Sequence, residues 1–418
     1  MMISYKQALQ ILKKSSITIK DETINSKDAV NRVLSSNIVS PAQYPSANNA
    51  AFDGFAIRSK DTKGLSKSNF KKFKIIGCIA SGDKPLSKKT NAFEAVEIMT
   101  GAILPKTFDT IIPIEQIKFE QDKKGNKYII VNRNIKKSLH VRYQGSDYKK
   151  NDLIIKKGTI IQPNHILALE TLGIQKIKVK KKPNILFFST GNEISNNKII
   201  PTWKIRNSNS KYINALDYNF LFNFKNGGIV KDHQEEYLFN RIKKILKSNI
   251  DIIITTGAVS AGKFDFVPSA IKKFTLSNFF NGVSIRPGKP ILFARIKNSP
   301  KAIFGLPGNP ISSAACFRFF IQPFIMQILG VSDELPLKAI LKKQFHKKKD
   351  ITRFVKSKLT SSRNGRLELE VLQKQESFRI RSFIHSNIWA VFPSGKSDFK
   401  KGDIIDCYIP HLSNKNIN

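Results

Sequence analysis

Three short apolar runs, each followed by a glycine-containing turn, constrain the fold of this chain more than any other feature. Runs of this length without polar alternation are typical of parallel strands that are buried on both faces. Helical patterns separate them, so residues 176–330 predict a doubly wound α/β domain. The runs are Ile185-Leu186-Phe187-Phe188 before Ser189-Thr190-Gly191, Ile252-Ile253-Ile254 before Thr255-Thr256-Gly257, and Ala302-Ile303-Phe304-Gly305-Leu306 before Pro307-Gly308-Asn309-Pro310.

Two of the helices in this domain have clear sequence limits. The spacing predicts one helix from about Ser210 to Lys225, which Gly227-Gly228 would end. The other follows the third apolar run: Asn309 can cap it, Pro310 suits its first turn, and Pro323 should bend it.

The segments on either side of the α/β domain have a different character. Helical patterns are expected after Ser4, which is placed to cap the first, and again over residues 26–36 and 163–173. Residues 47–139 alternate short apolar runs with Gly, Pro and Lys and predict a β-rich insert. Residues 331–418 predict a small C-terminal domain resembling a β-barrel.

The composition limits the class of protein. The formal net charge of +40 is found in nucleic-acid binders, but the lysines are spread along the whole chain and no aromatic-interleaved basic motif accompanies them. Solvated faces therefore explain the charge better, and the positive field favours anionic small substrates. The three separated cysteines and six scattered histidines argue against a disulfide framework or a zinc site and indicate a cytoplasmic setting. Because no long apolar stretch stands out, no membrane span is expected.

Chemistry is expected at the carboxyl ends of the parallel strands, where open α/β sheets bind their ligands. The loop 257–262 has glycines that let a phosphate approach the backbone, although a turn that only needs glycine would look the same. Arg286 and Lys289 flank a rigid turn and suit an anion. Carboxylates there can hold Mg²⁺ or orient water, although each alone could equally be a cap or turn former. The carboxylates beside a glycine or a predicted strand end are Asp53, Asp147, Glu193, Asp232 and Asp265.

A series of motifs runs along the chain from Asn49 to Pro310. They are Asn49-Ala50-Ala51-Phe52-Asp53-Gly54-Phe55-Ala56, Glu97-Ile98-Met99-Thr100-Gly101-Ala102, Arg142-Tyr143-Gln144-Gly145-Ser146-Asp147, Ser189-Thr190-Gly191-Asn192-Glu193, residues 256–262 with Asp265-Phe266-Val267-Pro268, Arg286-Pro287-Gly288-Lys289-Pro290 and Gly305-Leu306-Pro307-Gly308-Asn309-Pro310. Together and in this order they resemble the MoeA family of molybdopterin molybdenumtransferases, which includes the E domain of gephyrin.

The resemblance implies an elongated homodimer of four-domain subunits. Domain I would combine residues 1–45 and 140–175, domain II would be residues 46–139, domain III the molybdopterin-binding residues 176–330, and domain IV residues 331–418. The implied activity is the Mg²⁺-dependent insertion of molybdenum from molybdate into adenylylated molybdopterin, with release of AMP and the molybdenum cofactor. A molybdopterin adenylyltransferase and molybdoenzymes would be partners; a membrane would not.

The resemblance also assigns residues to an active site shared between domain II of one subunit and domain III of the other. Asp53, Thr100 and Asp147 would come from the partner side, and Glu193, Asp232, Asp265, Arg286 and Lys289 would line the domain III pocket, the three acidic ones as metal ligands. The residues expected around the pterin and its phosphate are Thr190, Gly191, Gly257, Val259, Ser260, Gly262, Pro307, Gly308, Asn309 and Pro310.

Two departures from the family pattern bear on the roles of site residues. Asn207 stands where the family has an acidic residue, which leaves a metal role at that position in question. Domain IV matches loosely, and only Arg381 and Ser382 are candidates for substrate contacts there. Two other functions stay open: a carrier of the same fold that binds the cofactor without turnover, and nucleic-acid binding driven by charge.

Overall fold

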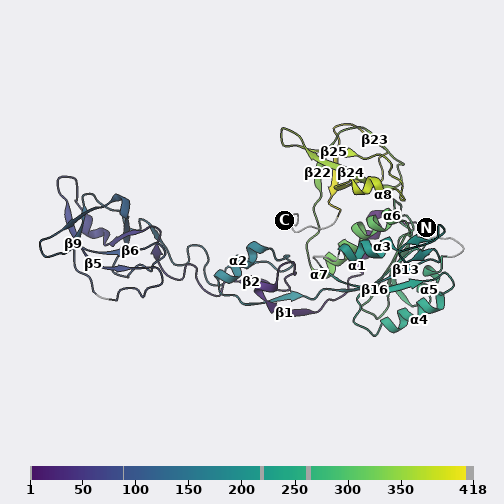
Figure 1. Ribbon diagram of the computed structural model, residues 1–418, viewed down its shortest axis with the longest axis horizontal. Helices are drawn as coiled ribbons and strands as arrows, with labels where there is room; N and C mark the ends of the chain where they lie inside the picture. The colour runs from purple at the N-terminus through teal and green to yellow at the C-terminus, as the bar shows by residue number, and fades with distance from the viewer. Residues whose placement is uncertain (1, 88, 217–220, 260–264, 411–418) are drawn as a thin grey trace. The chain divides into compact units, whose positions relative to one another are not determined.

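The computed structural model describes residues 2–87, 89–216, 221–259 and 265–410 (Figure 1). The chain forms two compact units. Unit 1 comprises Met1–Ser36, Lys156–Leu167 and Gln175–Asn418, and unit 2 comprises Asn37–Ile155 and Ala168–Ile174. The predicted domain I, residues 1–45 and 140–175, is divided between these two units.

Unit 1 is built on a six-stranded sheet with the strand order β16-β13-β17-β21-β20-β18. The first four strands are parallel. At one side, β20 runs antiparallel to β21, and β18 pairs antiparallel with β20. The three apolar runs are β13, β17 and β21, so the predicted doubly wound α/β domain is confirmed. The strands are β13 (Asn184–Thr190), β16 (Asn223–Val230), β17 (Ile252–Thr256), β18 (Leu276–Asn281), β20 (Leu292–Ile296) and β21 (Ala302–Leu306).

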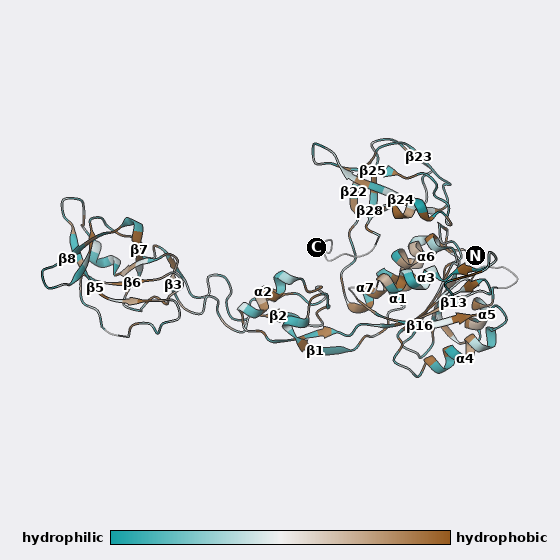
Figure 2. Cartoon of the chain, in the orientation of Figure 1, coloured by the Kyte–Doolittle hydropathy of each residue, from teal (hydrophilic) through white to brown (hydrophobic). Residues whose placement is uncertain are grey.

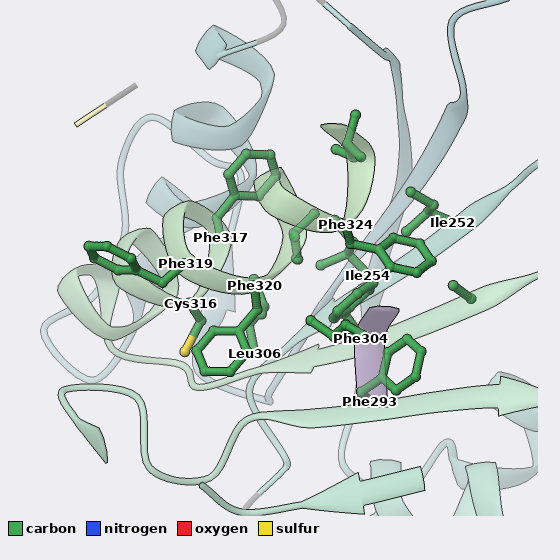
Figure 3. Packing of buried hydrophobic residues seen from close by; sticks show 14 of the residues in the cluster. Ile252, Ile254, Phe293, Phe304, Leu306, Cys316, Phe317, Phe319, Phe320 and Phe324 are labelled. Atoms are coloured by element: carbon green, nitrogen blue, oxygen red, sulfur yellow. The ribbon is translucent and has the colours of Figure 1, made fainter. Parts of the chain in front are cut away.

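Helices cover both faces of this sheet, which is why the central strands β17 and β21 are buried at every position. Phe187 of β13 belongs to one apolar cluster, and its neighbour Phe188 belongs to a second cluster on the other face. Figure 3 shows Phe304 of β21 beside Phe324, and their ring centroids are 5.4 Å apart. On the other face, α4 carries both hydrophilic and hydrophobic residues (Figure 2), as expected of a helix with one buried side. The helices are α1 (Tyr5–Lys14), α3 (Ser208–Leu216), α4 (Glu235–Ile245) and α5 (Val267–Lys272).

The apolar segment Pro310–Leu329 consists of α6 (Pro310–Cys316), a π-helical turn η5 (Phe317–Ile321) and α7 (Gln322–Leu329). It is long and apolar enough to cross a membrane, but 83% of it is buried inside the structure, as in the core helix of a globular domain. The π turn lies where the sequence predicts a bend. Pro323 has no N–H to offer the carbonyl of Phe319, and the Tyr5 hydroxyl donates to that carbonyl instead, at 3.3 Å.

Two predicted helices are longer than the helices in the structure. The helix predicted from about Ser210 is α3, which begins at Ser208. It does not extend to Lys225, because residues 223–230 form strand β16. Gly227-Gly228 lies inside that strand: a Cβ on Gly227 would come within 2.5 Å of the Phe188 ring, so the glycine permits close packing of neighbouring strands. Of the helix predicted over residues 26–36, only η1 (Ser26–Asp28) is helical. Leu34 forms a β-bridge with Val179, so pairing between strands overrides the helical spacing.

The other N-terminal expectations are confirmed. Ser4 caps α1 in a reciprocal capping box: its hydroxyl accepts from the Gln7 N–H at 3.2 Å, and its own N–H donates to the Gln7 side chain at 2.8 Å. Helix α2 (Pro163–Thr171) ends before Gly173, whose φ is +71°. Strands β1 (Asp21–Asn25) and β12 (Lys176–Lys180) form an antiparallel pair in unit 1.

The C-terminal part of unit 1 is a closed five-stranded barrel, as predicted. Its strands follow the order β24-β25-β22-β28-β26, and β26 pairs back onto β24. The short strand β19 (Ile285–Arg286) of the α/β region joins β24 in parallel. The barrel elements are β22 (Leu337–Leu341), β24 (Thr352–Ser361), β25 (Leu367–Val371), α8 (Ile380–Ile384), β26 (Ile388–Phe392) and β28 (Ile404–Tyr408), with the outer pair β23 (Phe345–His346) and β27 (Asp398–Phe399).

The barrel and the α/β sheet share part of one apolar core. The Phe319 ring of η5 stacks on Phe354 of β24, with centroids 4.0 Å apart and an interplanar angle of 8°. One terminal nitrogen of the buried Arg318 guanidinium donates to both carboxylate oxygens of Glu334, at 2.6 and 2.7 Å, and its Nε donates to the carbonyl of Ile409 at 2.6 Å. One apolar cluster of unit 1 therefore extends from the sheet into the barrel.

Unit 2 confirms the predicted β-rich insert. Its main sheet has the order β7-β4-β6-β5-β9-β8, with separate apolar clusters on its two sides. Two short antiparallel pairs accompany it, β2 with β11 and β3 with β10. The strands are β2 (Ile38–Val39), β3 (Asn49–Ala50), β4 (Gly54–Ile57), β5 (Lys71–Ile79), β6 (Glu94–Ile98), β7 (Thr110–Pro113), β8 (Lys118–Gln121), β9 (Lys127–Val131), β10 (Val141–Arg142) and β11 (Leu153–Ile155), with the 3-10 turns η2 (Ser59–Thr62) and η3 (Ile114–Gln116).

Candidate functional site

The carboxyl ends of β13, β17 and β21 meet at one edge of the unit 1 sheet. Ser189 is in register with Thr256, and Thr256 with Leu306, so the turns that follow these strands lie side by side. The Thr190 hydroxyl donates to the carbonyl of Thr256 at 2.9 Å, and the Gly257 N–H donates to that of Leu306 at 2.9 Å. The edge carries most of the turn residues expected around the pterin: Thr190, Gly191, Gly257, Pro307, Gly308, Asn309 and Pro310.

Glycine is required where these turns touch. Gly257 has φ +89°, and a Cβ there would lie 2.6 Å from the carbonyl oxygen of Thr190. Ala258 follows with φ +49°, a left-handed conformation that is costly for alanine and common at functional turns. Val259 was expected beside the pterin, but its side chain is buried in the core against Gly305. Ser260 and Gly262 lie outside the described residues.

Two of the predicted carboxylates come from adjacent loops at this edge. The Asn192 N–H donates to the Asp232 carboxylate at 3.4 Å, and the Asp232 N–H donates to the Asn192 side chain at 3.3 Å. The Glu193 carboxylate folds back over Gly191, where a Cβ would come within 2.4 Å of it. Asp265 lies in the segment before α5. Within the described ranges, no three His, Cys, Asp or Glu side chains gather as a metal cluster.

Asn207 has a partner that explains its amide. The residue is buried, its side-chain oxygen accepts from the Ser189 hydroxyl at 2.7 Å, and its NH₂ donates to Asn196 at 3.1 Å. A carboxylate could accept the first bond but could not donate the second. Asn207 therefore braces the loop after β13.

The cations of the site come from two parts of unit 1. Arg286 and Lys289 are exposed on β19 and the turn after it. Sequence reasoning missed Arg353 of β24, which is in register with Arg286. Burial, and to a smaller extent the charge of Arg286, lower the pKa of Arg353, and its guanidinium lies 5.2 Å above the Phe345 ring. Two neighbouring guanidinium groups suit a doubly charged anion.

The barrel reaches the same edge through Ser377, which sequence reasoning also missed. The Asn309 side chain donates to the Ser377 hydroxyl at 3.2 Å, and the Ile311 N–H donates to the Ser377 carbonyl at 3.4 Å. Asn309 occupies the predicted N-cap position of α6, but its side chain makes no capping bond. Pro310 stands in the first turn as predicted. Ser382 donates to the Lys374 carbonyl at 2.9 Å and, with Arg381, lines a pocket of about 310 Å³.

Unit 2 brings together its own predicted residues. The N–H and hydroxyl of Thr100 both donate to one oxygen of the Asp53 carboxylate, at 2.6 and 2.7 Å, and these two bonds lower the pKa of Asp53. Asp147 lines a cavity of about 560 Å³ together with Arg142 and Gly101, the residue after Thr100. Unit 2 thus presents the Asp147 carboxylate beside Arg142 in a polar hollow.

Known proteins match this chain along almost its full length. Residues 3–173 match the MoeA N-terminal region (domain I and II), residues 187–327 a probable molybdopterin binding domain, and residues 338–409 the MoeA C-terminal region (domain IV). A molybdopterin molybdenumtransferase of Staphylococcus epidermidis is 31% identical over 410 residues, which are 97% of this chain and 94% of the relative. The chain belongs to the MoeA family.

Other members of the MoeA family agree. A molybdopterin molybdenumtransferase of Staphylococcus aureus is 31% identical over 408 residues, 97% of this chain and 94% of the relative. The crystal structure of a molybdopterin biosynthesis MoeA protein from Pyrococcus horikoshii superposes with a TM-score of 0.83 at 26% identity and covers 98% of this chain and 100% of that one. The family resemblance of the motifs and the multidomain fold are both confirmed.

Proposed function

We propose that this chain inserts molybdenum from molybdate into adenylylated molybdopterin, releasing AMP and yielding the molybdenum cofactor. The observation that carries the proposal is the strand-end edge. Tight glycine turns and the carboxylates of Glu193 and Asp232 lie in the segment that matches a molybdopterin binding domain, and Arg286 of the same segment is in register with Arg353 of the barrel. The relatives named for molybdenum transfer extend over the whole chain, which supports an enzyme of the same kind.

The roles follow from charge and position. The turn at Gly257 leaves room for the pterin phosphate to approach the backbone. Arg286, Lys289 and Arg353 neutralise the oxygens of molybdate or of the phosphoanhydride. Transfer of molybdenum and cleavage of the anhydride then depend on holding both substrates in place within this field, without a covalent nucleophile.

The carboxylates fit Mg²⁺. This ion prefers oxygen ligands and usually takes one or two protein carboxylates, completing its shell with water and substrate phosphates. Glu193 and Asp232 provide two carboxylates on neighbouring loops, and Asp265 is the third predicted ligand. When bound, the ion supplies charge neutralisation at the phosphate oxygens. Glu193 and Asp232 orient it and keep it at the strand ends.

The proposal includes a homodimer in which unit 2 of one subunit completes the strand-end site of the other. Asp53, Thr100 and Asp147 would face the substrate from the partner side. Their support is chemical: the polar hollow of unit 2 holds Asp147 and Arg142, and the Asp53 carboxylate is held by Thr100, the residue before Gly101 of that hollow. We place the protein in the cytoplasm, supplied by an adenylyltransferase and delivering its product to molybdoenzymes.

The test is a turnover assay on purified protein. Adenylylated molybdopterin, molybdate and Mg²⁺ are supplied, and AMP release is measured for the wild type, Asp53→Ala and Glu193→Ala. Molybdate-dependent AMP release that falls sharply in both variants is expected. Mixing the two inactive variants should restore part of the activity, because a mixed dimer contains one intact shared site.

Two results would overturn the proposal. Tight binding of the pterin by a folded protein without AMP release would identify a carrier instead. If the pterin does not bind and the protein retains DNA in a salt-dependent way, the positive charge serves nucleic acid.

A further inference from the structure

A buried lysine lies beneath the barrel loop that reaches the strand-end site. Lys356 of β24 is 1% exposed, and its ammonium donates to the carbonyls of Lys374 at 3.1 Å, Glu376 at 3.3 Å and Arg379 at 3.1 Å. An ammonium has three N–H donors, so each of them has an acceptor here. Burial lowers the pKa of Lys356 to about 8, although the charge of Glu376 opposes the shift.

The same loop is fastened to β24 a second time, through Gln375. Its side-chain oxygen accepts from the Lys356 N–H at 3.0 Å, and its NH₂ donates to the carbonyls of Lys356 at 2.8 Å and Leu372 at 2.6 Å. The Gln375 side chain thus bonds both the N–H and the carbonyl of Lys356, as the backbone of a neighbouring strand would. Residues 372–379 are therefore tied to the barrel at several backbone groups.

The outer side of this loop is the part that touches the α/β region. Ser377 lies between the anchored carbonyls of Glu376 and Arg379, and it is the residue that contacts Asn309 and Ile311 at the end of β21. A continuous series of hydrogen bonds therefore runs from the buried ammonium through the loop to the turn beside Gly308.

We propose that Lys356 is a positioning residue of the molybdopterin site: it holds the carbonyls on both sides of Ser377 and so fixes the loop against the turn that follows β21. The inference rests on the proposed function, because it assigns the loop to the substrate site. Lys356 itself contacts no substrate, and its effect is carried by the position of Ser377 and Asn309.

The chain offers a matched control in Lys301. It is also buried, at 4% exposure, and its ammonium donates to the carbonyls of Ser248, at 2.6 Å, and Ile250. Lys301 lies immediately before β21 and Ile250 shortly before β17, so this anchor is at the amino-terminal edge of the sheet, opposite the site. Removing either lysine takes a donor away from backbone carbonyls, but only one of the two anchors supports the loop.

The experiment compares Lys356→Met with Lys301→Met in the full-length protein. Amide hydrogen exchange is measured over 372–382 and 307–312, and KM and kcat are measured for adenylylated molybdopterin. In Lys356→Met, both segments should exchange faster and KM should rise about tenfold or more, with a smaller change in kcat. Lys301→Met should lower the thermal transition but leave exchange at these segments and KM unchanged.

Ser377→Ala is the second variant, and it keeps Lys356 in place. It should raise KM in the same direction while exchange at 374–376 stays as in the wild type. The proposal is overturned if Lys356→Met leaves exchange over 307–312 unchanged, if Lys301→Met raises KM equally, or if Ser377→Ala has no effect on KM. A wild-type protein without turnover would refute the proposed function, whereas the exchange comparison still decides the role of Lys356.

Discussion

Replacing Gly257 by alanine should cost the protein a large part of its stability. The φ of +89° at this position places an L residue in the left-handed region, which costs about 1–2 kcal/mol. The added methyl group would lie 2.6 Å from the Thr190 carbonyl oxygen and 2.9 Å from its hydroxyl. Both atoms are held by the sheet, so overpacking adds about 1–3 kcal/mol. Together the free energy of unfolding should fall by about 2–5 kcal/mol.

Gly308→Ala is the matched control. Its methyl group would meet only the Gly257 Cα, at 3.6 Å, which is ordinary van der Waals contact, so the free energy of unfolding should stay within about 0.5 kcal/mol of wild type. Urea unfolding followed by circular dichroism measures both variants, and pterin binding is measured on each at low urea. A Gly257→Ala protein with the wild-type midpoint, or a Gly308→Ala protein equally destabilised, would refute the reasoning.

Three further outcomes are expected. Thr100→Val should reduce AMP release and move the pKa of Asp53 back up toward its usual value. Because this pKa is depressed in the folded protein, the Asp53 carboxylate contributes stability above the unfolded pKa of about 3.9. That contribution is lost as the pH falls through the folded pKa. NMR titration of the Asp53 carboxylate would show whether that shift is absent. Arg318→Met should lower the free energy of unfolding by about 3–5 kcal/mol, because it leaves Glu334 and a buried carbonyl without their partner; a thermal scan that matches wild type would contradict this. Of the two tryptophans, Trp203 is 74% exposed on the loop beside Glu193, so its fluorescence should change when molybdopterin binds, and Trp203→Phe should abolish the change.

The apolar runs predicted the central sheet well, because strands that are buried on both faces read as continuous apolar runs in the sequence. Phe187 and Phe188 face opposite clusters, which only a strand covered on both sides requires. Gly227 misled the prediction for a physical reason. It accommodates the ring of Phe188 on the neighbouring strand, and a single sequence cannot distinguish such a close approach from the end of a helix.

The site was predictable where topology alone decides it. Parallel strands end at one edge, so Thr190, Gly257 and Gly308 had to meet there. Arg353 and Ser377 could not be found in this way. They belong to the barrel and reach the edge through the pairing of β19 with β24 and through a loop held by a buried lysine, contacts between residues far apart in the sequence.

The pairing of β19 with β24 has a mechanical consequence. Rotation of the barrel as a rigid body away from the sheet would break main-chain hydrogen bonds and separate the stacked rings of Phe319 and Phe354. Barrel and sheet should therefore melt in one cooperative step and resist proteolytic separation. Product release in such a protein depends on small loop and side-chain displacements at the strand ends, since the barrel is not free to swing open like a lid.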